Sequence, residues 1–306
     1  MGGQPVVTAQ PSTVSDLITV HRLTHPMPIM LACYGVWGAC FAAIVTDVDW
    51  LLAIPALVAN MLFFAAGLAL NTVADAESDK FHGEKRSLAF AVGRISPRNT
   101  LYWAIGEILC GLGLVVVISV LTGRWQVLAC ALAIVAAHLA YNLRPLRLKH
   151  RGWPGSVVFG LGTTTLPVLL SYAAVAAHLD TLVAVIAAGL GIMCTGRTAW
   201  WSVPDLDGDR KAGDGTPAVR HGAARTTGTA SATMAVGVAV VASGLSALLG
   251  FGLAAVAVAM HVVVLAIAIA PLTGARIPLA SWAGKRVLLF VTLGELSLAL
   301  VPLAAA

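Results

Sequence analysis

Nine long apolar runs limit the folds that are open to this chain. They lie near residues 27–46, 51–75, 100–121, 124–142, 156–177, 181–203, 229–248, 250–271 and 286–304. Each is about 20 residues long and lacks the alternation of a strand, and a run of this length crosses a bilayer as a helix. Only 11% of the residues are charged, against about 25% in soluble domains. We therefore predict an all-α polytopic membrane protein with about nine transmembrane helices.

The basic residues fall almost entirely on one side of these predicted spans. Of the 19 Lys and Arg residues, only Arg124 lies in a loop on the other side. Cytoplasmic loops carry an excess of Lys and Arg, so the bias predicts a cytoplasmic N-terminus and an external C-terminus. It also accounts for the positive net charge, which we do not interpret as nucleic-acid binding. We expect a polar N-terminal segment, residues 1–26, followed by a single transmembrane domain, residues 27–306.

Two acidic clusters end predicted spans on the cytoplasmic side. In the first cluster, Asn71, Asp75 and Asp79 are four residues apart, so on a continuous helix they share one face. The second cluster is Asp205-Leu-Asp207-Gly-Asp209, after the sixth run. Acidic residues at a helix end are often only solvated, but two clusters in equivalent positions favour a shared site.

Carboxylate and amide oxygens at this spacing are hard ligands that suit Mg²⁺, which binds through a few carboxylates and substrate phosphates. A diphosphate is the natural ligand, because it is too negative to approach bare carboxylates without metal. Arg86, Lys149 and Arg210 lie near the clusters and are expected to contact its remaining oxygens. A diphosphate held at the cytoplasmic surface above an apolar bundle describes a prenyl diphosphate whose isoprenoid tail lies among the helices.

Some polar and aromatic residues lie inside the predicted spans, where ionisable groups are functional candidates. Arg197 precedes Asp205 by two helical turns, so it either reaches the second cluster and the diphosphate or pairs with Glu107 or Glu295. His138 either abstracts a proton or is a satisfied interhelical histidine. Trp200 and Trp201 either stabilise a carbocation or belong to an interfacial aromatic belt.

These motifs resemble the UbiA superfamily of intramembrane prenyltransferases. The resemblance rests on Asn71-xxx-Asp75-xxx-Asp79, on Asp205-xxx-Asp209-Arg210, on Tyr141-Asn-Leu-Arg-Pro-Leu-Arg-Leu-Lys149 and on Arg22-Leu-Thr-His-Pro26. It implies nine helices around a central cavity open to the cytoplasm, a prenyl diphosphate donor and Mg²⁺. It further implies that Asn71, Asp75, Asp79, Asp205 and Asp209 are metal ligands and catalytic, and that Arg86, Lys149 and Arg210 contact the diphosphate. We also expect Arg22, Tyr141 and Arg197 to bind substrate. The chain departs from the family at Thr72, where many members have Asp, and at Ser87, where many have Pro.

The sequence leaves more than one function open. The leading hypothesis is a Mg²⁺-dependent prenyltransferase that ionises a prenyl diphosphate and transfers the prenyl group to a lipophilic or aromatic acceptor. The alternative is a UbiA-type membrane terpene cyclase, in which the prenyl chain attacks itself. A transporter is disfavoured, because its ion site is expected at the midplane of the membrane. The acceptor, the length of the prenyl chain and the oligomeric state cannot be read from the sequence.

Overall fold

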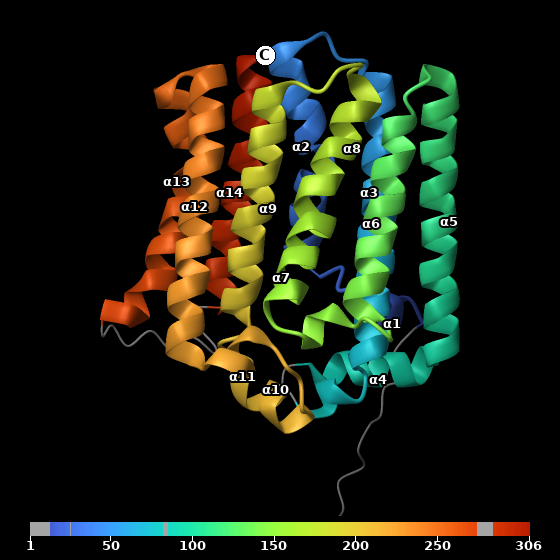
Figure 1. Cartoon of the computed structure of the whole chain (residues 1–306). Coiled ribbons are helices and arrows are strands. Elements are labelled where there is room, and N and C mark those ends of the chain that lie inside the picture. Colours follow the sequence, from blue (N-terminus) through green and yellow to red (C-terminus); the bar gives the residue numbers. More distant parts are fainter. Residues whose placement is uncertain (1–12, 25, 82–84, 274–283) are drawn as a thin grey trace, which may run out of the picture.

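The computed structural model describes residues 13–24, 26–81, 85–273 and 284–306. Within these ranges, nine helical segments are long and apolar enough to cross a membrane, which confirms the predicted fold class. The spans are α2 (Met27–Val45), α3 (Trp50–Asp75), α5 (Pro97–Thr122), α6 (Trp125–Asn142), α7–η3–α8 (Trp153–Val175), α9 (Thr181–Trp201), α12 (Ala223–Leu249), α13–η4 (Phe251–Thr273) and α14 (Gly284–Ala305). The long helices run side by side, and the C-terminus lies at the end opposite α4 and α10 (Figure 1).

Short helices gather at the other end of the bundle (Figure 1). They are α1 (Thr13–Val20), η1 (Ser78–Phe81), α4 (Arg86–Ile95), η2 (Leu148–His150), α10 (Leu206–Ala212) and α11 (Pro217–His221). We call this the α4–α10 end. It contains the acidic clusters, whereas tight turns close the opposite end. There Asp49 and Asp180 accept hydrogen bonds from backbone amides of α3 and α9, as N-cap residues do.

The helices approach one another closely where small residues line their contacts. A Cβ atom on Gly196 of α9 would lie 2.7 Å from the carbonyl oxygen of Ala230 of α12, and one on Gly38 of α2 would overlap the backbone of α8. Lipid provides no hydrophobic drive for helix association, so close backbone packing of this kind holds membrane bundles together. The fifth span contains a π-helical segment, η3 (Leu161–Thr165), of the sort that often marks functional sites.

The described part of the N-terminal segment, from Thr13 on, packs on the bundle. Helix α1 packs against α4 and α3, and three polar contacts hold it there. Buried Asp16 pairs with Arg94 of α4. His21 Nε2 lies 3.0 Å from Glu107 Oε1 of α5, and Thr72 Oγ1 donates a hydrogen bond to Val20 O at 2.9 Å.

Candidate active site

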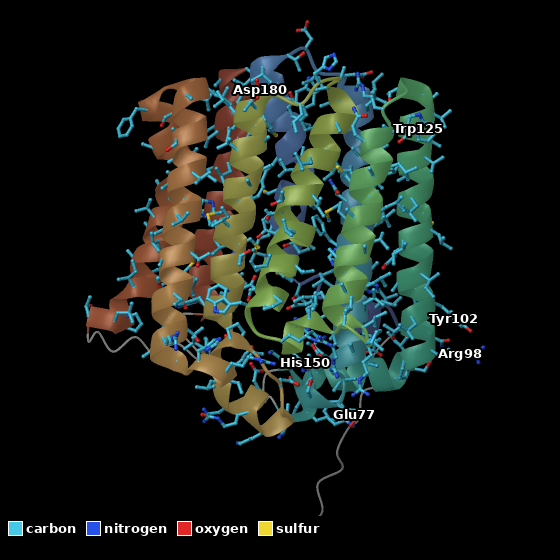
Figure 2. The ribbon with its side chains drawn as sticks, in the orientation of Figure 1. Glu77, Arg98, Tyr102, Trp125, His150 and Asp180 are labelled. Atoms are coloured by element: carbon cyan, nitrogen blue, oxygen red, sulfur yellow. The ribbon has the colours of Figure 1, made fainter. Side chains whose placement is uncertain are left out.

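A cavity of about 410 Å³ lies inside the bundle at the α4–α10 end. Its lining includes all five residues expected as metal ligands, namely Asn71, Asp75, Asp79, Asp205 and Asp209. The two acidic clusters, 130 residues apart in sequence, therefore open onto one space. Figure 2 shows His150, another lining residue, at this end, and Asp180 at the opposite end.

The first cluster departs from the expected continuous helix. Helix α3 ends at Asp75, and Asp79 lies on the separate 3₁₀ turn η1. Ser78 Oγ donates a 3.1 Å hydrogen bond to Asp75 O, a carbonyl that the helix end leaves free. Glu77 lies on the surface (Figure 2), where it pairs with Lys80. The chain thus turns after Asp75, and Asp79 still lines the cavity.

Asn71 is held between two neighbouring segments. Its Oδ1 accepts a 2.8 Å hydrogen bond from Arg22 Nη2, and its Nδ2 donates to Asn142 Oδ1 at 3.0 Å. Lys149 Nζ donates to the same Asn142 oxygen at 3.3 Å. These bonds fix the amide orientation of Asn71 and bring Arg22, from the segment after α1, to the cavity.

Cations already surround the Asp75 carboxylate. Lys149 Nζ lies 2.7 Å and Arg147 Nη2 3.3 Å from Asp75 Oδ1. Lys149 is only 9% exposed. Burial lowers the pKa of Lys149, although the negative charge of Asp75 opposes this shift. The buried carboxylate and ammonium group therefore stabilise each other at the polar end of the cavity.

The second cluster lies on a short helix. Asp205 precedes α10, and Asp209 is one turn further along, with its backbone amide bonded to Asp205 O. Thr216 Oγ1 donates to Asp209 Oδ2 at 2.9 Å. Burial raises the pKa of Asp209 to about 6, and the Thr216 hydrogen bond opposes the rise. Gly213 ends α10 in a left-handed conformation, with φ of 75°, as glycine readily does.

Two contacts connect the second cluster to the rest of the site. Lys85 Nζ lies 2.7 Å from Asp205 Oδ2. His150 Nδ1 lies 2.6 Å from Asp214 Oδ1, while its Nε2 is 3.8 Å from Asp75. Burial would lower the pKa of His150, but the hydrogen bonds to Asp214 and Asp75 raise it. His150 thus links the loop after α10 to the first cluster.

The expected diphosphate contacts divide into two groups. Arg22, Tyr141 and Lys149 line the cavity. Arg86 and Arg210 are exposed and lie outside the cavity lining, and Arg86 Nε bonds to Lys80 O. In this structure neither arginine reaches the cavity, and their contact with a diphosphate stays a prediction. Lys85, which precedes α4, lines the cavity, whereas the adjacent Arg86 does not.

Arg197 lines the cavity but is engaged in a buried network. Its Nη1 lies 2.6 Å from Glu295 Oε1, and its Nη2 lies 2.6 Å from the Tyr34 hydroxyl, which donates to the same carboxylate. Glu295 is fully buried. Glu107, the other expected partner, pairs with His21 instead. Of the two predicted roles for Arg197, the structure shows the pairing with Glu295.

The wall beyond the polar end is apolar and aromatic. Its side chains include Met27, Met30, Leu31, Tyr34, Phe64, Phe159 and Trp201. Tyr141 packs on Phe159 with ring centroids 5.3 Å apart. Trp201 lines the cavity, whereas Trp200 is buried against its edge. The cavity thus joins a charged layer to an apolar chamber.

The oxygen donors fit a hard divalent cation. Within the described parts of the chain, no three His, Cys, Asp or Glu side chains form a ready-made metal cluster. Mg²⁺ does not require one, because it keeps waters and binds through one or two carboxylates together with substrate phosphates. The amide and four carboxylates that line the cavity can supply such ligands from both sides.

Sequence reasoning missed several polar residues of the site, four of which are amide-bearing or ionisable. Asn142, Lys85, His150 and Asp214 line the cavity, but none belongs to an acidic cluster. The polar Asn142 at the end of an apolar run was a usable signal. Thr72, the departure from the family motif, is buried and faces away from the cavity lining, because its hydroxyl bonds to Val20 O and Leu68 O.

These observations define a class of protein: a multi-pass membrane protein whose intramembrane cavity joins oxygen ligands and cations to an apolar chamber. A sequence model of the UbiA prenyltransferase family matches residues 31–294, and the chain belongs to this family. The sequence matches none of the curated proteins compared with it.

Solved structures share the fold. A UbiA homologue from Archaeoglobus fulgidus, bound to DMAPP and Mg²⁺, has a TM-score of 0.73 at 14% identity, covering 95% of this chain and 100% of its own. The same homologue bound to GPP and Mg²⁺ has a TM-score of 0.71 at 15% identity, covering 95% and 99%. The apo structure of a UbiA homologue from Aeropyrum pernix K1 has a TM-score of 0.61 at 18% identity, covering 91% and 98%.

Proposed function

We propose that this protein is a Mg²⁺-dependent intramembrane prenyltransferase that transfers a prenyl group from a prenyl diphosphate to a lipophilic acceptor. One observation carries the proposal: a single cavity has oxygen ligands and cations at one end and an apolar, aromatic wall at the other. A prenyl diphosphate has the same division, with a polyanionic head and a hydrocarbon tail. Family membership supports the proposal, as do the related structures bound to DMAPP or GPP with Mg²⁺.

In this proposal, Asn71, Asp75, Asp79, Asp205 and Asp209 hold the metal. Bound there, Mg²⁺ supplies a Lewis acid that draws charge from the diphosphate and favours its departure. Arg22, Lys85, Arg147 and Lys149 contribute positive charge. Three of them contact Asp75 or Asp205, and in this proposal they form charge-assisted hydrogen bonds to the oxygens of the arriving diphosphate.

The apolar wall has two tasks in the reaction. It holds the isoprenoid tail, and it excludes water that would otherwise capture the allylic cation. As the C–O bond breaks, its electron pair leaves with the diphosphate, and the acceptor forms the new bond to carbon. The aromatic faces of Tyr141, Phe159 and Trp201 suit a transient positive charge.

The same aromatic lining supports a second candidate, a membrane terpene cyclase. Purified protein incubated with Mg²⁺ and prenyl diphosphates of several lengths, without acceptor, tests both candidates. A transferase releases diphosphate slowly and gives an allylic alcohol or an acyclic hydrocarbon. Cyclic hydrocarbons would instead establish the cyclase. Diphosphate release that EDTA does not abolish would count against either form of the proposal.

We also propose that the α4–α10 end faces the cytoplasm, since the Lys and Arg residues gather there. In a background without native cysteines, Lys211→Cys and His178→Cys place one exposed thiol at each end. An impermeant thiol reagent added outside intact cells should label position 178 and spare position 211. The reverse pattern would overturn the orientation.

A further inference from the structure

His138 is a histidine of the cavity wall whose ring has an unsatisfied nitrogen among the described residues. It lies on α6 and contributes to the cavity wall. Its Nε2 is shielded from water and has no hydrogen-bond partner among the residues that the structure describes. Buried polar atoms are normally paired, so an unpaired one calls for an explanation. A purely structural histidine would be expected to bond across to a neighbouring helix.

His138 lies close to the charged layer of the cavity, which contains Asn71 and Asn142. It precedes Asn142 by one helical turn, about 6 Å along the axis, and Asn142 Nδ2 donates to His138 O at 3.1 Å. Asn142 in turn bonds to Asn71. On the facing helix, Gly67 also precedes Asn71 by one turn. The imidazole therefore lies one turn below the layer that would hold the diphosphate.

The ring is seated on Gly67. A Cβ atom at Gly67 would lie 2.5 Å from His138 Nδ1, so the absence of a side chain on α3 makes room for the imidazole. Both residues line the cavity. Trp201, the last residue of α9, lines the cavity as well. When the allylic carbon separates from the diphosphate, it would lie beside these three residues, one helical turn below the charged layer.

We propose that His138 is a catalytic residue that accepts the proton released when the allylic cation is resolved. This inference rests on the proposed function. The C–O bond of the prenyl diphosphate breaks, and its electron pair leaves on the diphosphate. When the cation is attacked, an electron pair of the acceptor forms the new carbon bond and the acceptor's proton passes to a ring nitrogen of His138. Without an acceptor, a C–H electron pair of the cation forms the new double bond, and that proton takes the same route.

The chemistry of the cavity favours this base over its neighbours. The Asp75 and Asp205 carboxylates are paired with Lys149 and Lys85 and are assigned to the metal. Neutral imidazole has one nitrogen that can accept a proton, and histidine is the commonest general base near neutral pH. The departing diphosphate is the competing acceptor, and the experiment distinguishes the two.

Geranyl diphosphate with Mg²⁺ and no added acceptor provides the test. Three quantities are measured: diphosphate released, hydrocarbon formed by proton loss, and alcohol formed by water capture. Wild-type protein is expected to give hydrocarbon together with alcohol. His138→Gln should release diphosphate within about threefold of the wild-type rate, since ionisation depends on the metal layer. Its ratio of hydrocarbon to alcohol should fall by at least about tenfold.

Further variants separate a lost base from a damaged fold. Imidazole added to His138→Ala should restore the hydrocarbon. Gly67→Ala, which displaces the ring, should lower the ratio in the same direction. The matched control is His261→Gln, because His261 is buried in α13 but does not line the cavity. It should leave the ratio unchanged.

Three outcomes would overturn the proposal. An unchanged ratio in His138→Gln would assign the proton to the diphosphate. Equal loss of diphosphate release and hydrocarbon, without imidazole rescue, would make His138 structural. Wild-type protein that forms alcohol alone would show that no base stands beside the cation. Wild-type protein that releases no diphosphate at all would instead count against the proposed function.

Discussion

Asp75 Oδ1 and Lys149 Nζ lie 2.7 Å apart, both largely buried, at the polar end of a membrane cavity. Each neutralises the other where neither could remain charged alone without a large cost. In the proposed reaction, a metal-bound diphosphate would offer the carboxylate a cation and the ammonium group an anion, so substrate binding would exchange one set of ion pairs for another.

The first prediction concerns the metal ligands. Asp75→Ala or Asp209→Ala should lower Mg²⁺-dependent diphosphate release by at least about 10²-fold, because each removes a ligand whose stabilisation of the leaving group amounts to several kcal/mol. Glu77→Gln is the matched control, since Glu77 is exposed and pairs only with Lys80 among the described residues. More than a tenth of wild-type activity in either alanine variant would contradict the assignment.

A second prediction separates two adjacent basic residues. Lys85→Gln should raise the KM for prenyl diphosphate by about tenfold, because a charge-assisted hydrogen bond typically contributes about 1.5–3 kcal/mol. Arg86→Gln should change the KM less than about twofold, since its side chain lies outside the cavity. Steady-state kinetics on both variants decide the matter. A larger effect at Arg86 would restore the role that the sequence suggested for it.

The third prediction uses the two neighbouring tryptophans. Trp201→Leu should change the rate or the acceptor affinity and leave a single prenylated product, because only Trp201 lines the cavity. Trp200→Leu, the control, should reduce stability with little effect on the reaction. Product analysis by gas chromatography provides the measurement. New cyclic hydrocarbons from Trp201→Leu, with no acceptor present, would favour the cyclase.

A fourth prediction concerns the buried network in the membrane. Arg197→Met should destabilise the protein by about 3–5 kcal/mol, because it leaves the Glu295 carboxylate buried without its cation. The double variant Arg197→Met/Glu295→Met should be more stable than Arg197→Met alone. Thermal unfolding in detergent can compare them. If the effects of the two substitutions simply add, the pair is not coupled as the distances indicate.

The last prediction concerns pH and helix α1. Burial would lower the pKa of His21, but the hydrogen bond and charge of Glu107 raise it above its ordinary value near 6.5. Protonated His21 therefore stabilises the fold fully below about pH 6.5, and this contribution is lost as pH rises through the raised pKa. The difference in thermal stability between wild type and His21→Gln should shrink from about pH 6 to about pH 9.

Asp16→Asn provides the comparison for that experiment. The hydrogen bond with Arg94 lowers the pKa of Asp16 and raises that of Arg94, so both stay charged throughout this range. The effect of Asp16→Asn on thermal stability should therefore not change between about pH 6 and about pH 9. A constant difference for His21→Gln would show that the histidine does not titrate as proposed.

The architecture could be predicted because bilayer thickness fixes how long an apolar run must be. All nine spans were found, within a few residues in most cases. The seventh was placed too late, from residue 229, because α12 begins at Ala223 with polar residues that sequence hydropathy does not count as membrane. Helix α1 was missed, since eight residues give too short a pattern to distinguish from a loop.

The site was only partly readable from the sequence. Helical spacing brought Asn71 and Asp75 together, but it could not show that the helix would end at Asp75. Adjacent residues such as Lys85 and Arg86 look equivalent in sequence, and only the local path of the chain decides which reaches the cavity. The sequence could not decide whether Arg197 pairs with Glu107 or with Glu295, because pairing between side chains of different helices depends on how the helices are arranged in three dimensions.

The Arg197–Glu295 pair has a consequence for how the protein is made. Arg197 lies in the sixth span and Glu295 in the ninth, so a ribosome delivers the arginine to the membrane well before its partner. An arginine inside a membrane helix is costly to insert unless it finds a partner. The nascent bundle must therefore hold this unpaired charge until translation is almost complete. A chain truncated before α14 would lack Glu295, the carboxylate that neutralises Arg197. Quality-control proteases would recognise the truncated product by the uncompensated charge of this arginine.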